Sequence, residues 1–399
     1  MHLSFPRFHL ICLLTVLTGS VTGCGGPGRN TSVSEVLEVL YVADSSAGNI
    51  QAYRIDNATG TLTALPGSPF PGGGGTGVAV DASGKFLFVG SPDGQIVDVY
   101  SISPGTGALA KLTDPNSDSR QPGQTGAGGR YGLLGTFAGS FAVIPSRQLL
   151  YVTNTNEGGV YAFSIGSSGE LTPLTGSPFN VPLTNPLGLA ADPSGKFLYT
   201  GNIWDGSILE STIDPMSGAL TAATGSPFDA GTCCTLTVDQ SGGFLYRSVI
   251  GNSIYAFAVS PDTGALTPVD GSPFLLGRAD HFAGDPRGRF LYGSFTGYGD
   301  GTELPDVNGT ISATAINEST GALTSIPGSP FRVEMGANFV AIDPTGKFLY
   351  VSNLGVRGQN HGSLSAYAID PTTGTLAPIP GFPISAGQSP QALAIVQLQ

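Results

Sequence analysis

Short apolar runs alternate with tight turns along nearly the whole chain, and the pattern is clearest between residues 187 and 223. Apolar or alternating segments cover Leu187–Ala191, Phe197–Asn202, Ser207–Asp214 and Leu220–Ala223, and turns rich in Pro and Gly separate them. Runs of this length are typical of β-strands, and Pro and Gly supply the backbone angles that tight turns need. Each such unit therefore predicts four antiparallel strands.

Two motifs repeat with this unit and allow the units to be counted. A Ser/Thr-Gly-x-Leu turn occurs seven times, beginning at Thr59, Thr106, Ser168, Ser217, Thr263, Thr320 and Thr373. A second motif, close to Asp-Pro-Ser-Gly-Lys-Phe-Leu-Tyr, precedes these turns at residues 81, 144, 192, 239, 285 and 343, with a degenerate copy at 34. Four-stranded units repeated about every 40–50 residues are typical of β-propeller blades. We predict an all-β, seven-bladed β-propeller of four-stranded antiparallel blades.

The two ends of the chain predict how the ring closes. The repeats begin at a second strand, Val39–Asp44, and finish with a lone first strand, Pro390–Val396. We expect the C-terminal strand to complete the N-terminal blade, because closure removes exposed strand edges.

The tetrapeptide Gly-Ser-Pro-Phe also recurs, and it raises the question of a nucleophilic serine. Five copies follow the outer strands, starting at residues 67, 176, 225, 271 and 328. A nucleophile is needed once, so five copies indicate a structural role. We expect the phenylalanine to pack between neighbouring blades, and Phe179 and Phe274 to be shielded from solvent.

The repeated Asp-Pro-Ser-Gly-Lys-Phe-Leu-Tyr and Thr-Gly-x-Leu motifs resemble those of the lactonase-type seven-bladed propellers. This family includes 6-phosphogluconolactonases and is related to the YVTN-repeat surface proteins, and the resemblance covers nearly all of residues 36–399. It implies a lactone hydrolase whose site carries Gly-Pro-Arg-His before one blade's first strand and Asn-Glu after its second. His281 falls on the family histidine, whereas Asp280 stands at the arginine position and Phe295 and Thr296 stand at the Asn-Glu positions.

The N-terminus predicts export. An apolar run, Leu10–Val21, is too short to span a bilayer and has the length of a signal-peptide core. It ends in Val-Thr-Gly-Cys24, which resembles the bacterial lipobox, although an ordinary signal peptide with an incidental cysteine is the alternative. We expect a lipoprotein signal peptide at 1–23, lipidation of Cys24, a flexible tether at 24–35 and the propeller at 36–399. Such a protein is anchored to the bacterial cell envelope, in the periplasm or at the outer membrane, and meets a membrane only through this lipid.

Charge and cysteine content narrow the function. The net charge is −12 and no basic run exceeds two residues, so nucleic acid is not an expected partner. After the signal only two histidines remain, and no Cys-x-x-Cys occurs, so we expect no metal and no cofactor. The adjacent Cys233 and Cys234 could form a vicinal disulfide or two buried thiols, and the sequence leaves both open.

The loop-rich face is the predicted binding surface, because variable loops on a rigid scaffold usually carry the site. Three long irregular segments, Asp114–Gly139, Thr296–Thr310 and Leu354–Ser363, map to it. Aligning the repeats also places one column of residues at the mouth of the central channel, and Asn338 and Gln391 belong to it. The candidate ligand-binding residues are Trp204, Asn338, Gln391, Arg357, His361 and Glu303.

The candidate catalytic residues are His281, Arg278 and Asp280, since lactone opening needs a base for water and donors for the developing oxyanion. His281 could equally be a hydrogen-bonded residue of the channel rim, and Trp204 could stack on a ligand or pack against a blade. Two functions stand open. One is binding of a small molecule or protein partner on the loop-rich face by a monomer, and the other is lactone hydrolysis through His281.

Overall fold

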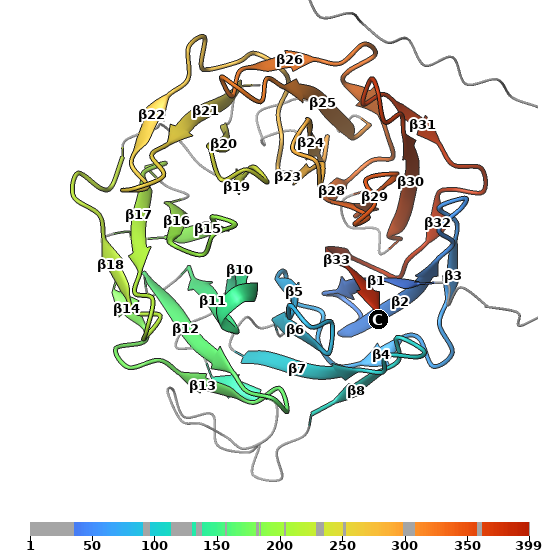
Figure 1. Ribbon diagram of the computed structural model, residues 1–399. Coiled ribbons are helices and arrows are strands. Elements are labelled where there is room, and N and C mark those ends of the chain that lie inside the picture. The colour runs from blue at the N-terminus through green and yellow to red at the C-terminus, as the bar shows by residue number, and fades with distance from the viewer. Residues whose placement is uncertain are drawn as a thin grey trace, which may run out of the picture. The chain divides into compact units, whose positions relative to one another are not determined.

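The computed structural model describes residues 36–90, 96–112, 130–132, 138–155, 158–180, 183, 185–202, 205–228, 235–249, 253–297, 308–356 and 361–398. Within these ranges, seven antiparallel sheets form the blades of a ring (Figure 1). The innermost strand of each blade lies beside that of the next, all the way round. The predicted seven-bladed propeller is therefore confirmed. No helix in the described ranges is long and apolar enough to cross a membrane.

The first three blades contain most of the N-terminal half. Blade 1 is β33 (Pro390–Leu398), β1 (Leu37–Asp44), β2 (Asn49–Ile55) and β3 (Leu62–Ala64), with β4 (Phe70–Pro71) beside β2. Blade 2 is β5 (Val78–Val80), β6 (Phe86–Gly90), β7 (Ile96–Ile102) and β8 (Leu109–Lys111), with β9 (Arg130–Gly132) beside β7. Blade 3 is β10 (Ala138–Ile144), β11 (Leu149–Asn154), β12 (Gly159–Ile165) and β13 (Leu171–Pro173), with β14 (Phe179–Asn180) beside β12; the 3-10 helix η1 (Pro145–Arg147) follows β10.

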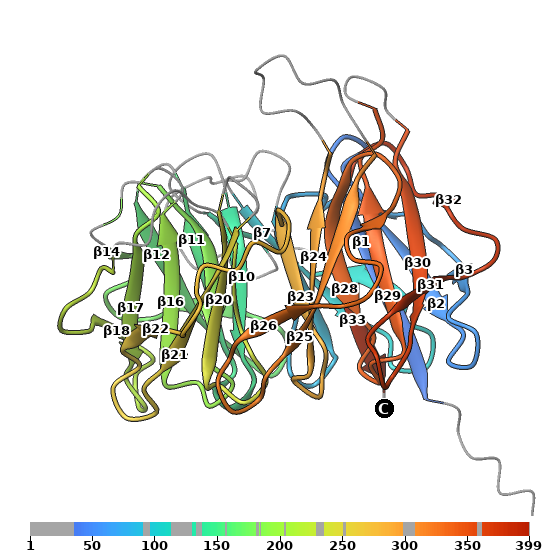
Figure 2. The same cartoon turned by 90° about the horizontal axis from the view of Figure 1, so that it is seen from above.

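The remaining four blades follow in chain order. Blade 4 is β15 (Pro186–Ala191), β16 (Phe197–Asn202), β17 (Ile208–Ile213) and β18 (Leu220–Ala222). Blade 5 is β19 (Leu236–Val238), β20 (Phe244–Val249), β21 (Ser253–Val259) and β22 (Leu266–Pro268). Blade 6 is β23 (His281–Gly284), β24 (Phe290–Phe295), β25 (Thr310–Ile316) and β26 (Leu323–Ser325), with β27 (Phe331–Arg332) beside β25. Blade 7 is β28 (Ala337–Ile342), β29 (Phe348–Asn353), β30 (Ser363–Ile369) and β31 (Leu376–Pro378), with β32 (Ile384–Ser385) beside β30. The strands run between the two faces of the ring (Figure 2).

In five blades, the turn between the first two strands is built around an aspartate: Asp81, Asp192, Asp239, Asp285 and Asp343. In blade 7, Oδ1 of Asp343 accepts hydrogen bonds from the N–H groups of Lys347 at 2.8 Å and Phe348 at 2.6 Å. Gly346 completes the turn at φ 71°, which a side chain disfavours. The carboxylate thus satisfies backbone donors that the turn would otherwise leave unpaired.

Ring closure occurs as the chain ends predict. Strand β33 pairs antiparallel with β1, from Leu37 opposite Leu398 to Asp44 opposite Pro390. Asp44 also accepts the N–H groups of Gln388 at 2.6 Å and Ser389 at 3.0 Å, and it is fully buried. The last strand of the chain is therefore tied to the first by both backbone and side chain.

A tyrosine of one blade is hydrogen bonded to the Thr-Gly-x-Leu turn of the next in six of the seven blade interfaces. Each hydroxyl donates to the glycine carbonyl: Tyr41 to Gly107 at 2.6 Å, Tyr151 to Gly218 at 2.6 Å, Tyr199 to Gly264 at 2.8 Å, Tyr246 to Gly321 at 3.1 Å, Tyr292 to Gly374 at 2.8 Å and Tyr350 to Gly60 at 2.8 Å. Blade 2 has Phe88 in this place, which cannot donate.

The glycine of this turn is required for two reasons. Gly321 has φ 73°, and a Cβ there would lie 2.2 Å from Cδ1 of Phe244 in the preceding blade. A side chain would therefore be both strained and in collision with the neighbouring blade. The repeated Gly marks the point where the backbone of one blade meets the core of another.

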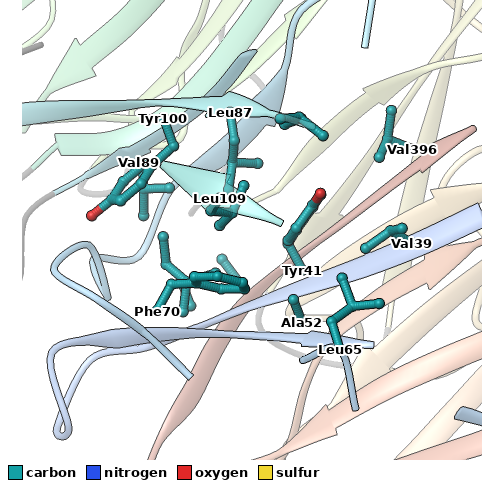
Figure 3. Close-up of a cluster of buried hydrophobic side chains, with 14 of the residues drawn as sticks. Val39, Tyr41, Ala52, Leu65, Phe70, Leu87, Val89, Tyr100, Leu109 and Val396 are labelled. Carbon is teal, nitrogen blue, oxygen red and sulfur yellow. The ribbon is translucent and has the colours of Figure 1, made fainter. Parts of the chain in front are cut away.

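Apolar side chains fill each blade interface. Between blades 1 and 2, Tyr41 and Phe70 lie among Leu87 and Leu109 of the next blade (Figure 3). Phe179 and Phe274 are half-buried and pack against the corresponding clusters, which confirms the structural role predicted for Gly-Ser-Pro-Phe.

The serine of that motif is a structural hydrogen-bond acceptor. In blade 6, Oγ of Ser329 accepts the N–H of Ala313 on β25 at 2.9 Å, and the other four copies make the same contact to their own third strands. The repeated contact indicates that these serines have a structural role within their blades rather than a catalytic one.

Blade 4 differs from the other blades at the buried residue that pairs with the inter-blade tyrosine. The residue directly opposite the inter-blade tyrosine is alanine in five blades, at positions 52, 162, 256, 313 and 366. In blade 4 it is Glu210, opposite Tyr199. Glu210 is 0% exposed, and neither carboxylate oxygen has a hydrogen-bond partner among the described residues. Burial raises the pKa of Glu210 to about 7.

The inter-blade hydrogen bond should contribute to stability, and this can be tested by removing the tyrosine hydroxyl in one blade and by adding one in blade 2. Tyr350→Phe should lower the free energy of unfolding by about 1–3 kcal/mol, because the carbonyl of Gly60 stays buried without its donor. Phe88→Tyr should leave stability equal or raise it by about 1 kcal/mol. Denaturant unfolding measures both. An unchanged stability of Tyr350→Phe would contradict the role given to this contact.

Glu210 predicts a pH-dependent stability. Its pKa is raised in the folded state from the ordinary 4.5 to about 7, so the folded protein holds this proton more tightly than the unfolded chain. The stability of the wild type should therefore fall as the pH rises from about 4.5 to 7, by up to about 3 kcal/mol. Glu210→Gln should match the wild type at pH 5 and exceed it at pH 8. Denaturant unfolding of both proteins between pH 5 and 8 measures this. A stability difference that stays the same at every pH would contradict the role given to Glu210.

Candidate functional site

A cavity of about 490 Å³ lies where the inner strands of all seven blades meet. Its walls are Thr76, Gly77, Val78, Ser140, Phe141, Leu187, Gly188, Leu189, Thr235, Leu236, Asp280, His281, Phe282, Phe339 and Gln391. Most of these residues occupy two neighbouring columns of the aligned repeats. The cavity combines phenyl and aliphatic surface with hydroxyl, amide, carboxylate and imidazole groups.

His281 is the first residue of β23, and its ring is held from two sides. Nδ1 lies 3.2 Å from the carbonyl oxygen of Asn338 in blade 7. The ring stacks on Phe339, with centroids 3.6 Å apart and planes at 25°. A carbonyl oxygen only accepts hydrogen bonds, so Nδ1 carries the proton in the neutral ring and Nε2 keeps its lone pair.

The surroundings of His281 keep the ring neutral. Burial lowers the pKa of His281 to about 4, although the Asp280 carboxylate and the bond to Asn338 act in the opposite direction. The half-buried side chain faces the cavity rather than open solvent. At neutral pH, Nε2 is therefore a proton acceptor for a ligand hydroxyl or a water molecule.

Asp280 is fixed at the cavity wall by residues of its own blade. Its Oδ2 accepts hydrogen bonds from the N–H and the Oγ1 hydroxyl of Thr296, both at 3.0 Å. Its Oδ1 lies 3.6 Å from Nε of Arg278. The Arg278 guanidinium lies over the Phe295 ring at 4.7 Å and is outside the set of residues that line the cavity.

These contacts bring together the positions where the sequence departs from the family motif. Asp280, Phe295 and Thr296 replace the expected Arg and Asn-Glu, and with Arg278 they form one contiguous cluster. The sequence alignment identified the positions. It did not show that the substituted residues contact one another.

A chain of hydrogen bonds continues from His281 into the closing blade. Nδ2 of Asn338 donates to the carbonyl and the Oε1 of Gln391, at 3.2 and 3.1 Å. Nε2 of Gln391 in turn donates to Oγ of Ser389 at 3.2 Å. Asn338 is buried, and Gln391 reaches the cavity. The structure thus links blades 6, 7 and 1 along one wall.

The other candidate residues lie elsewhere. The side chain of His361 is exposed and does not line the cavity. Trp204, Glu303, Arg357, Cys24, Cys233 and Cys234 lie outside the described residues, as does most of the three long loops. Within the described ranges, no group of three His, Cys, Asp or Glu side chains is placed to hold a metal ion.

Sequence reasoning missed Phe339 as the stacking partner of His281 and Thr296 as the anchor of Asp280. Phe339 belongs to the same repeat column as His281, which is a detectable signal. Its contact with the neighbouring blade depends on how far each blade is rotated from the last, and that follows only from the three-dimensional ring.

Comparisons with known proteins agree with this fold. Residues 26–123 and 302–397, just under half of the chain, match a family model described as "Lactonase, 7-bladed beta-propeller". A 6-phosphogluconolactonase of Serratia proteamaculans is 28% identical over 183 residues, which is 46% of this chain and 50% of that protein. The chain thus spans about half the length of the curated relative it matches.

Solved structures extend the likeness around the ring. A Bacteroides uniformis protein, described provisionally as a 6-phosphogluconolactonase, superimposes with a TM-score of 0.69 and 19% identity over 90% of this chain and 99% of its own. A periplasmic gluconolactonase of Pseudomonas aeruginosa gives a TM-score of 0.65 and 17% identity over 92% of this chain and 100% of its own. At these identities the structures show the fold alone. The resemblance to the lactonase-type propellers is therefore confirmed.

Proposed function

We propose that this lactonase-type propeller binds a lactone in its central cavity and opens the ring by hydrolysis. The observation that carries the proposal is His281, whose Nδ1–H is engaged by the carbonyl of Asn338 while its Nε2 is left as a base at the cavity wall. The family model and the names of the relatives support the same reaction class.

The reaction needs one base and a set of donors. A water molecule attacks the lactone carbonyl carbon, and its proton passes to Nε2 of His281. The tetrahedral oxyanion then collapses, the ring C–O bond breaks, and the leaving oxygen takes the proton from Nε2 to give a hydroxy acid. Ser140, Thr235 and Gln391 supply hydroxyl and amide donors along the wall for the oxyanion.

Burial keeps His281 unprotonated at neutral pH, so Nε2 can accept the proton of the attacking water. The phenyl rings of Phe141, Phe282 and Phe339 offer flat surfaces for one face of the ligand.

Ligand binding without turnover is the second candidate function. It is favoured by Asp280, Phe295 and Thr296, which stand where the family resemblance implies Arg, Asn and Glu. Export, lipid attachment at Cys24 and the monomeric state stay predictions of the sequence.

Hydrolysis of a panel of γ- and δ-lactones, with and without phosphate, tests the proposal. His281→Gln should lower kcat/KM by about 100-fold or more, because the general base is lost. In the wild type, kcat/KM should be level between pH 6 and 8 and fall only as the pH drops towards about 4, where Nε2 becomes protonated.

Lys347→Gln is the matched control, because Lys347 is exposed in a tight turn between the first two strands of blade 7. Its activity should equal that of the wild type. Turnover of no lactone, or full activity in His281→Gln, would contradict hydrolysis through this residue.

A further inference from the structure

We infer that the cavity selects uncharged lactones over phosphorylated ones, and that Asp280 is the residue that sets this selectivity. The inference rests on the proposed lactone site and names its substrate class. Three features carry it: the position of the carboxylate, the placement of the nearest cation, and the apolar walls.

The Asp280 carboxylate lines the cavity and is held rigidly in place. The two hydrogen bonds from Thr296 fix Oδ2, and the backbone N–H of Asp280 donates to the carbonyl of Ser294 at 2.5 Å. A carboxylate fixed at both backbone and side chain cannot turn away from an incoming anion. We therefore expect the carboxylate to keep this position when a ligand occupies the cavity.

Among the described residues, the cation paired with this carboxylate lies outside the cavity lining. Arg278 approaches Oδ1 of Asp280 through Nε at 3.6 Å, and its guanidinium plane is spread over Phe295. Asp280 belongs to the cavity lining, and Arg278 does not. A phosphate inside the cavity would therefore lie closer to the Asp280 carboxylate than to the guanidinium, and the repulsion is strong where water is partly excluded.

The remaining described wall favours an uncharged ring. Phe141, Phe282 and Phe339 contribute aromatic carbon to the lining, and Leu187, Leu189 and Leu236 contribute aliphatic carbon. These surfaces suit the C–H face of a five- or six-membered lactone or an alkyl substituent on it. His281, neutral at physiological pH, contributes a hydrogen-bond acceptor and no positive charge. The described wall offers a phosphate dianion hydroxyl and amide donors but no Lys or Arg, so its charge would be partly desolvated without a matching cation.

A binding experiment with a matched ligand pair tests the inference without turnover. The probes are gluconolactam, a non-hydrolysable uncharged δ-lactam, and its 6-phosphate, titrated calorimetrically into the full chain at 150 mM NaCl. The uncharged lactam should bind at least about tenfold more tightly, as one fixed carboxylate near a dianion predicts after screening. Asp280→Asn keeps the shape and the acceptor for Thr296, and it should reduce that ratio by at least about tenfold.

Salt dependence provides a second measurement on the wild type alone, should the Asn variant fold poorly. Raising NaCl from 50 to 500 mM should narrow the ratio between the two lactams several-fold, because the repulsion is screened. Equal or tighter binding of the phosphorylated lactam, or a ratio that neither salt nor Asp280→Asn changes, would overturn the inference.

The outcomes separate this inference from the proposed hydrolysis. Selective binding of the uncharged lactam without turnover of any lactone would uphold the selectivity and reject the enzyme. Turnover of phosphorylated and uncharged lactones alike would uphold the enzyme and reject the selectivity. Binding of neither lactam, together with turnover of no lactone, would reject both.

Discussion

The hydrogen bond from a tyrosine hydroxyl to the glycine carbonyl of the next blade is the contact on which the ring depends. It fixes both the distance and the rotation between neighbouring blades, because a buried hydroxyl must meet a buried carbonyl of the next blade. The glycine is part of the same constraint, since any larger residue at Gly321 would strike Phe244 of the preceding blade. Six interfaces repeat this geometry, and the seventh replaces it with the apolar packing of Phe88.

The arrangement of residues in the candidate site depends on how neighbouring blades are placed in the ring. His281 belongs to blade 6, its hydrogen-bond acceptor Asn338 belongs to blade 7, and Gln391 belongs to the last strand of the chain, which completes blade 1. Closure by β33 therefore places Gln391 beside Asn338 and completes this wall of the cavity. A small rotation between blades 6 and 7 would separate Nδ1 of His281 from the carbonyl that fixes its tautomer.

Much of the fold could be predicted because its information is local and repeated. The Thr-Gly-x-Leu turns count the blades, and the tyrosine and glycine that join them are both visible in the repeats. The two channel columns also follow from the alignment, so the wall near Asp280, His281 and Gln391 could be located. What could not be predicted are individual side-chain contacts: the stacking of His281 on Phe339 of the next blade, and, within single blades, the anchoring of Asp280 by Thr296 and the burial of Glu210 opposite Tyr199. No periodicity encodes these contacts, because each departs from its repeat at one position only.

Among the described residues, the hydrogen bond of Nδ1 to Asn338 leaves Nε2 of a neutral His281 as the nitrogen that a ligand in the cavity can use. Two-dimensional ¹H–¹⁵N NMR of protein labelled in its histidines, with His281→Gln to assign the signal, tests it most directly. The account predicts that His281 stays in the Nδ1–H tautomer from pH 8 down to about pH 5 and takes up a second proton only near pH 4. A ring that carries its proton on Nε2 at pH 7, or that becomes cationic near pH 6.5, would contradict the claim.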